Sequence, residues 1–353
     1  MTMKKIHALI ILALTFFCPV ALAQWENPSE RYVDAYKEYT DARCPIPVDS
    51  IKNFVYFARD RGLIHNHPFL KSSRFDGAQI MYSWAQLEPS EGQYDFSLIE
   101  SDYEYLKSQG KKLFVQLQDA TFDPKYKGVP AYLLTNAYDG GTIYQRNEEG
   151  VPEGWTAKRW NERVQERYFA LLDVLGTEFD GKVEGVNLQE TAIEVTEAYD
   201  PTFTPALYAA SVKKYMSALK KAFPNSVTMQ YANFMPGEWL PWEDEGYLNS
   251  IYQHGQDIGV GLGAPDLIVD RKGQLNHALA MMHESQYTVP LGIAVQDGNY
   301  VGETNSEAVI AGRENIVPML HAFADDFLHV TYMFWVDQEP YFEQDVMPCF
   351  SPD

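Results

Sequence analysis

The sequence predicts an α/β protein, a single (β/α)8 (TIM) barrel, on three observations. Eight short apolar segments alternate with segments of helical period along the chain. Residues 24–353 have the length of one barrel-sized domain, and no linker, repeat or low-complexity tract divides them. Polar residues gather where several apolar segments end, as they do at the carboxyl ends of parallel barrel strands.

Residues 1–23 are expected to form a secretory signal peptide. Two lysines precede an apolar run, and an A-x-A cleavage site stands directly before Gln24. The run is too short to span a bilayer, and no later segment is long and apolar enough to do so. We therefore expect a secreted or periplasmic protein without membrane insertion, whose barrel domain occupies residues 24–353.

The first half of the barrel follows from alternating strand and helix signals. A surface helix is expected over residues 29–43, and a capping box at Ser97 opens a second helix that Gly110 closes. Residues 121–160 lack clear periodicity and carry many aromatic side chains, so we expect a loop wall that faces a substrate. The strands are expected at residues 53–58, 79–84 and 113–117.

The second half continues the alternation. Its sixth strand is rich in glycine but lacks a G-x-G-x-x-G spacing and a following Lys, so we expect close backbone packing there rather than phosphate binding. Thr204 and Pro205 mark the start of one helix. Helices are expected at residues 161–179, 204–223, 274–286 and 306–327. Strands are expected at residues 183–188, 226–234, 258–266, 290–297 and 329–336.

The fourth strand lies in residues 181–195, GKVEGVNLQETAIEV, and the rest of the chain is organised around it. Its apolar part ends at Leu188 and delivers Gln189 and Glu190 to the rim of the barrel. A carboxylate at that position is a candidate for catalysis. The alternative is an ion pair with a nearby Arg or Lys that holds the loop.

Residues 84–96, WAQLEPSEGQYDF, resemble the W-x-x-L-E-P-x-x-G-x-Y-D-F signature of the large retaining clan of (β/α)8 glycoside hydrolases, which includes barrel-type bacterial β-galactosidases. The resemblance implies hydrolysis of O-glycosidic bonds in an oligosaccharide or polysaccharide. In that clan the general acid/base is a Glu at the end of strand four, which matches Glu190. An aromatic floor at the end of strand eight matches Trp335, and Gln189 stands where the clan usually has Asn.

Glycosidic hydrolysis needs a second carboxylate, as nucleophile or as the base that activates water. The clan has a Glu at the end of strand seven, whereas this sequence has Asp297 there, so Asp297 is the expected partner of Glu190. The alternative function is a non-catalytic glycan-binding barrel that has lost the strand-seven nucleophile. Other rim carboxylates that could serve instead are Asp119, Asp266, Asp337 and Glu339.

A carbohydrate is the expected partner, and the sequence gives no oligomeric state. Aromatic residues make up 14% of the chain, and many lie in polar segments where their faces can stack on sugar rings. The formal net charge of −21 repels phosphate backbones, which argues against nucleic acid. The residues expected to contact the sugar are Trp84, Asp119, Trp155, Gln189, Tyr231, Asn233, Trp239, Asp266 and Trp335.

Cys44 and Cys349 are the two cysteines that follow the leader. An even pair in an exported protein indicates a disulfide, here between the two ends of the domain. His65 and His67 have the spacing of two metal ligands, but no Cys or third His stands near them. Neither a metal site nor a cofactor is therefore expected.

Overall fold

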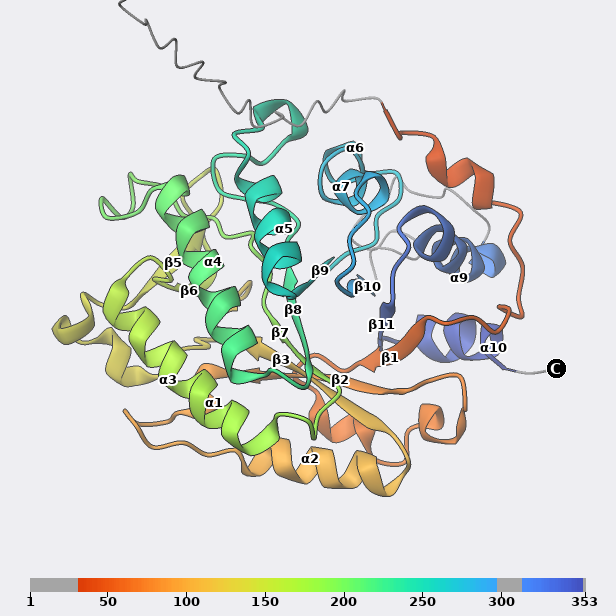
Figure 1. Cartoon of the computed structure of the whole chain (residues 1–353), viewed down its shortest axis with the longest axis horizontal. Coiled ribbons are helices and arrows are strands. Elements are labelled where there is room, and N and C mark those ends of the chain that lie inside the picture. The colour runs from red at the N-terminus through yellow and green to blue at the C-terminus, as the bar shows by residue number, and fades with distance from the viewer. Residues whose placement is uncertain (1–30, 297–312, 352–353) are drawn as a thin grey trace, which may run out of the picture.

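A computed structural model of the chain describes residues 31–296 and 313–351, and eight parallel strands form a closed barrel at its centre (Figure 1). The order around the barrel is β1-β11-β10-β9-β8-β7-β3-β2, which is chain order with one antiparallel insertion left out. The predicted fold class is confirmed. The strands are β1 (Lys52–Tyr56), β2 (Gly77–Ser83), β3 (Lys112–Gln118), β7 (Gly185–Leu188), β8 (Val227–Tyr231), β9 (Gly261–Ala264), β10 (Leu291–Val295) and β11 (Tyr332–Val336).

Helices surround the barrel, as Figure 1 shows for α2 to α5 on one side and α9 and α10 on the other. The α-helices are α1 (Trp84–Leu87), α2 (Ser97–Ser108), α3 (Glu162–Phe179), α4 (Pro205–Ala222), α5 (Tyr247–Ile258), α6 (Lys272–Leu275), α7 (Ala278–Glu284), α9 (Arg313–Ala322) and α10 (Met347–Cys349). Two π-helical segments are Phe323–Phe327 and Phe342–Val346. Short 3₁₀ turns are Ala35–Tyr39, Arg61–Ile64, Pro68–Lys71, Ala131–Leu134, Asn136–Tyr138 and Pro241–Glu243.

The helix ends show which local signals were read correctly. The Asn161 side chain accepts from the second and third amides of α3, and the Thr204 hydroxyl accepts from Leu207 N at 3.1 Å, as expected of N-caps. The capping box at Ser97 is wrong, because Phe96 is the N-cap and the Asp95 carboxylate accepts from Ser97 N at 3.0 Å. Only one 3₁₀ turn forms within the described part of the expected helix at residues 29–43.

One expected helix is divided in the structure, and one helix of the structure was not expected. The helix expected over residues 274–286 is divided into α6 and α7, which meet at His277. Helix α5 was not predicted, because its apolar stripe begins directly after the tryptophan-rich loop that follows β8. Among the described residues, no helix combines the length and the apolar character that crossing a bilayer requires.

The barrel interior is filled mainly by aromatic side chains. A Cβ on Gly263 would lie 2.1 Å from the carbonyl oxygen of Gly292 on the neighbouring strand, so the glycine of β9 permits close backbone approach, as expected. A second and larger apolar layer lies between the strands and the helices. The interior cluster comprises Phe54, Tyr56, Phe114, Met229, Tyr231, Ala294, Tyr332 and Phe334.

Residues 121–160, expected to be irregular, contain most of a small antiparallel sheet in the order β4-β6-β5. Its strands are β4 (Ala120–Thr121), β5 (Thr142–Arg146) and β6 (Pro152–Ala157). Gly150, with φ of +79°, makes the turn between β5 and β6, and Asn147 Oδ1 accepts from Val151 N at 2.8 Å. The alternation of polar and apolar residues in β5 and β6 is too short to be a strong strand signal. The pairing of β6 with the two-residue strand β4 could not be predicted from it.

The predicted disulfide between Cys44 and Cys349 is present, and the two Cα atoms lie 4.7 Å apart. It joins positions separated by 305 residues. Next to it, Ile46 N donates to the carbonyl oxygen of Cys349 at 2.9 Å. The bridge therefore fastens the leading segment to the end of the chain. The predicted signal peptide, residues 1–23, lies outside the described residues and stays a prediction.

Replacing both bridge cysteines by Ala should lower the free energy of unfolding by about 2–4 kcal/mol, because the unfolded chain regains the freedom of a very long loop. Urea unfolding followed by circular dichroism measures the change, with the parent in the presence and absence of a reductant as the comparison. An unchanged midpoint in the double variant would show that the bridge adds no stability.

Candidate active site

A cavity of about 270 Å³ opens where the barrel strands end. Its walls come from the carboxyl ends of seven barrel strands and the segments after them, which is where barrel enzymes bind their ligands. The lining residues are Tyr56, Arg59, Met81, Gln116, Gln118, Phe122, Asp123, Gln189, Glu190, Tyr231, Pro265, Ala294 and Gln296. A groove of about 460 Å³ lies elsewhere, on the outer faces of α3, α4 and α5, where no strand ends.

The Glu190 carboxyl lies in this cavity, directly after β7. Asn233, after β8, donates from Nδ2 to Glu190 Oε2 at 2.8 Å. Burial, and next the negative charge of Asp266, raise the pKa of Glu190 to about 7, against the opposing effects of the Asn233 amide and Arg159. The carboxyl therefore carries its proton below about pH 7, as a proton donor must.

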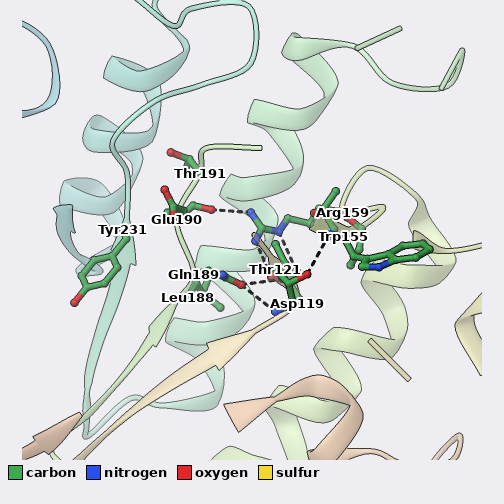
Figure 2. A network of polar contacts seen from close by, with 12 residues as sticks. Asp119, Thr121, Trp155, Arg159, Leu188, Gln189, Glu190, Thr191 and Tyr231 are labelled. Carbon is green, nitrogen blue, oxygen red and sulfur yellow. Dashed lines mark hydrogen bonds and ion pairs between the residues drawn. The ribbon is translucent and has the colours of Figure 1, made fainter. Parts of the chain in front are cut away.

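The main chain of Glu190 is held by a buried network that Figure 2 shows. Arg159 Nη1 donates to the carbonyl oxygen of Glu190 at 3.0 Å and to the Tyr208 hydroxyl at 2.7 Å. The same guanidinium donates to both oxygens of Asp119, at 2.8 and 2.6 Å. The alternative interpretation was that Glu190 forms an ion pair with a nearby Arg or Lys. In the structure the nearby Arg159 pairs with Asp119 instead, and the Glu190 carboxyl faces the cavity.

Gln189 has a positioning role as well as a place in the cavity wall. Its side-chain oxygen accepts from the backbone amides of Asp119 and Ala120, at 3.2 and 2.9 Å (Figure 2). Its carbonyl oxygen accepts from Gln230 Nε2 at 2.7 Å. The end of β7 is thereby fixed to both neighbouring strands, so Glu190 projects from a rigid segment.

Asp266 follows β9 and is the described rim carboxylate whose charge acts on Glu190. Gln296 Nε2, directly after β10, donates to Asp266 Oδ1 at 3.1 Å and to the carbonyl of Pro265 at 3.0 Å. Asp297, the partner expected from the sequence, is the next residue of the chain and lies outside the described residues. The structure thus brings Glu190, Asn233 and Asp266 together at the rim.

Two tryptophans expected to contact the sugar lie in the core instead. Trp84 is 1% exposed and donates to Glu88 Oε2 at 2.8 Å, and Trp335 is 0% exposed and donates to Asn53 Oδ1 at 2.9 Å. Neither lines the cavity. Both indoles are amphipathic, and a buried amide or carboxylate satisfies the N–H that solvent or sugar would otherwise meet.

The structure gives the residues of the signature segment a structural use. The buried Glu88 carboxylate accepts from the Trp84 indole, from Gly92 N at 2.8 Å and from Arg167. Gly92 has a φ of +70°, which favours glycine. These contacts fold the segment between β2 and α2 behind the rim, so the segment shapes the barrel without touching the cavity.

Of the remaining aromatic predictions, Trp155 and Trp239 lie outside the barrel strands, whereas Tyr231 ends β8. Trp155, on β6, is half-buried, and its ring centroid lies 3.7 Å from that of Tyr144. Trp239 is half-buried beside Phe234, with ring centroids 6.0 Å apart. Tyr231 lines the cavity, and its hydroxyl accepts from Gln79 Nε2 at 3.2 Å. Of the three, Tyr231 is the one placed on the cavity wall.

Several cavity residues that are not acidic were not among the residues expected to contact the sugar. Tyr56 and Gln118 are the last residues of β1 and β3, and burial together with the charge of Glu190 raises the pKa of Tyr56. Arg59 donates from Nε to Gln118 Oε1 at 3.2 Å and lies over the ring of Tyr126. Their position at strand ends was a usable signal.

No family model matches the sequence, and no curated protein matches it. The structure is similar to the catalytic domain of a beta-amylase from Paenibacillus polymyxa, with 10% identity over 82% of this chain and 93% of that chain and a TM-score of 0.54. A xylanase from Paenibacillus barcinonensis, solved with a conduramine derivative, has 14% identity over 84% and 88% of the two chains and a TM-score of 0.49.

The similarity to the beta-amylase domain shows the fold alone, because barrels of this kind support many unrelated chemistries. The fold and the site together define a (β/α)8 barrel with a carboxyl and amide constellation at the carboxyl ends of its strands. The function depends on the chemistry of that constellation.

Proposed function

We propose that this protein is a glycoside hydrolase in which Glu190 is the proton donor to the leaving oxygen. The observation that carries the proposal is the Glu190 carboxyl, with a pKa of about 7, in a cavity at the strand ends. Cleavage of an O-glycosidic bond needs such an acid beside a carboxylate that stays ionised. The predicted signal peptide adds that the enzyme is secreted or periplasmic.

Asp266 and Asp297 are our first candidates for the second carboxylate among the acidic residues of the rim. The charge of Asp266 already acts on Glu190, and the Gln296 amide donates a hydrogen bond to the Asp266 carboxylate. Asp297, which lies outside the described residues, is the carboxylate that the sequence predicts at the end of strand seven. Asp119 is not a candidate, because Arg159 binds both of its oxygens in a buried ion pair.

The cavity fits an uncharged polyhydroxylated substrate. Aromatic side chains, Tyr56, Phe122 and Tyr231, supply surfaces that the C–H faces of a sugar ring can contact. Gln116 adds an amide to the cavity wall, and its Oε1 has no hydrogen-bond partner within the described part of the chain. Trp155 and Trp239 remain proposed walls on the loops around the opening.

Incubation with a panel of oligosaccharides and polysaccharides tests the proposal by the release of reducing ends. The parent should cleave at least one glycan, and loss of the second carboxylate, by Asp266→Ala or Asp297→Ala, should abolish that cleavage. Azide should restore turnover to the variant that lacks a nucleophile, with a glycosyl azide as product. A parent that binds glycans from the panel without cleaving any would instead identify the glycan-binding alternative.

Replacing Asn233 with Ala should move the alkaline limb of kcat/KM upward by about one pH unit. The Asn233 amide favours the ionised form of Glu190, and such a bond to a charged group is worth roughly 1.5–3 kcal/mol. Kinetics between about pH 5 and pH 9 measure the limb. Asn136→Ala, on an exposed 3₁₀ turn, is the control. A limb that stays in place would remove Asn233 from the tuning of the acid.

A further inference from the structure

Three potential metal ligands meet beside the barrel rim, outside the proposed active site. Glu238 and Asp244 belong to the loop between β8 and α5, and His277 lies between α6 and α7. One ligand atom from each residue lies within 4.8 Å of the other two. None of the three lines the cavity that contains Glu190.

His277 is the member of this cluster with an unmet need. It is 0% exposed, and within the described residues neither ring nitrogen has a hydrogen-bond partner. Its Nε2 lies 3.0 Å from Glu238 Oε1, but the contact is not aligned as a hydrogen bond. A buried polar nitrogen without a partner is costly, so an additional group that binds both His277 Nε2 and Glu238 Oε1 would be stabilising.

The two carboxylates are held in place by backbone amides. Glu238 Oε2 accepts from Tyr247 N at 2.6 Å, and Glu238 Oε1 accepts from Leu248 N at 3.1 Å, both at the start of α5. Asp244 Oδ1 accepts from Gly246 N at 2.7 Å, while Asp244 Oδ2 is buried without a partner among the described residues. The carboxylate oxygens that would bind the ion are therefore already held in place by these hydrogen bonds.

The electrostatics of the cluster favour a cation. Two carboxylates that face each other in a buried position repel, and a divalent ion between them would remove that repulsion. No Lys or Arg is paired with either carboxylate among the ion pairs of the described residues.

We propose that Glu238, Asp244 and His277 bind one divalent transition-metal ion, for which Zn²⁺ is the best match. Imidazole nitrogen suits Zn²⁺, whereas Ca²⁺ and Mg²⁺ prefer oxygen ligands alone. Three protein donors leave the fourth tetrahedral position to water.

The position of the site gives it a structural role. Glu238 belongs to the loop that carries Trp239, and His277 belongs to the segment after β9. In that segment Gln274 Nε2 donates to the carbonyl oxygen of Asp266 at 2.6 Å. A bound ion would join the two loops and so fix Asp266 at the rim. This inference does not depend on the proposed glycosidase activity.

Titration of EDTA-treated, dialysed protein with Zn²⁺ tests the site by calorimetry and by the thermal midpoint. We expect one Zn²⁺ per chain, a midpoint that rises with Zn²⁺ concentration and returns with EDTA, and no such rise with Mg²⁺. Parent protein that binds no stoichiometric Zn²⁺ would overturn the proposal.

Variants assign the ion to these residues. Asp244→Asn, at a half-buried position, and His277→Gln should each weaken Zn²⁺ binding more than about 10- to 100-fold, since loss of a supporting contact alone costs that much. His65→Gln, which removes an exposed imidazole, is the control for adventitious binding and should bind as the parent does. If His277→Gln does not fold, Asp244→Asn decides, and parent-like affinity in that variant would contradict the assignment.

Discussion

Replacing Glu190 with Gln should lower turnover by about 10²- to 10⁴-fold, because proton transfer from a positioned acid contributes that much to the rate. Gln is nearly the same size and can still accept the hydrogen bond from Asn233, so glycan binding should persist. Initial rates on a cleaved glycan and calorimetric affinity for the same glycan measure the two effects separately. A variant with near-parental turnover would overturn the assignment of Glu190.

The same substitution should stabilise the protein at alkaline pH. The pKa of Glu190 is raised from 4.5 to about 7 in the folded protein, so the folded state holds a proton that the unfolded chain has lost. The free energy of unfolding therefore falls as the pH rises from 4.5 to about 7. Above about pH 7 it is lower by up to about 3 kcal/mol.

Urea unfolding at about pH 4 and pH 8 measures this stabilisation. Glu190→Gln should exceed the parent at the higher pH and match it at the lower one. Glu104→Gln, on the exposed face of α2, is the control and should behave the same at both. Equal stability of parent and Glu190→Gln at pH 8 would mean that the carboxyl is not held protonated by its surroundings.

Breaking the buried ion pair with Asp119→Asn should cost about 3–5 kcal/mol of stability, because the Arg159 charge is left without its partner. The Asp119 and Arg159 side chains are 3% and 5% exposed. Denaturant unfolding measures the loss. Glu104→Gln breaks an exposed pair with Lys107 at 3.5 Å and should cost less than about 1 kcal/mol. Equal losses of stability in the two variants would show that burial does not make the Asp119–Arg159 pair more important than the exposed pair.

A double variant separates the structural role of this pair from its role in positioning Glu190. Asp119→Leu with Arg159→Met replaces the ion pair by apolar groups, which is often neutral for stability. The Glu190 carbonyl would still lose the hydrogen bond from Arg159, so we expect turnover to stay about 10²-fold low. Recovery of turnover together with stability would show that Arg159 supports the fold and does not position the acid.

The barrel strands were predictable because each is a short apolar run between polar turns, and a buried parallel strand needs little else. Glu190 was predictable for the same reason, since it follows directly on such a run. The roles of Trp84 and Trp335 were not, because an indole serves equally well in a core or under a sugar. Only the partners of the two indoles, Glu88 and Asn53, show which applies.

The sequence by itself determined the order of the strands, the disulfide partners and the place of one carboxyl at the rim. Tertiary structure alone decided that this carboxyl has a pKa near 7, because its burial, the charge of Asp266 and the opposing Asn233 amide depend on segments that follow other strands. It also decided that Asp119 is bound to Arg159, and that Glu238, Asp244 and His277 meet. The hydrophobic period of a segment predicts which of its residues are buried. A pKa, an ion pair or a set of metal ligands depends instead on distances between segments, which only the closed barrel fixes.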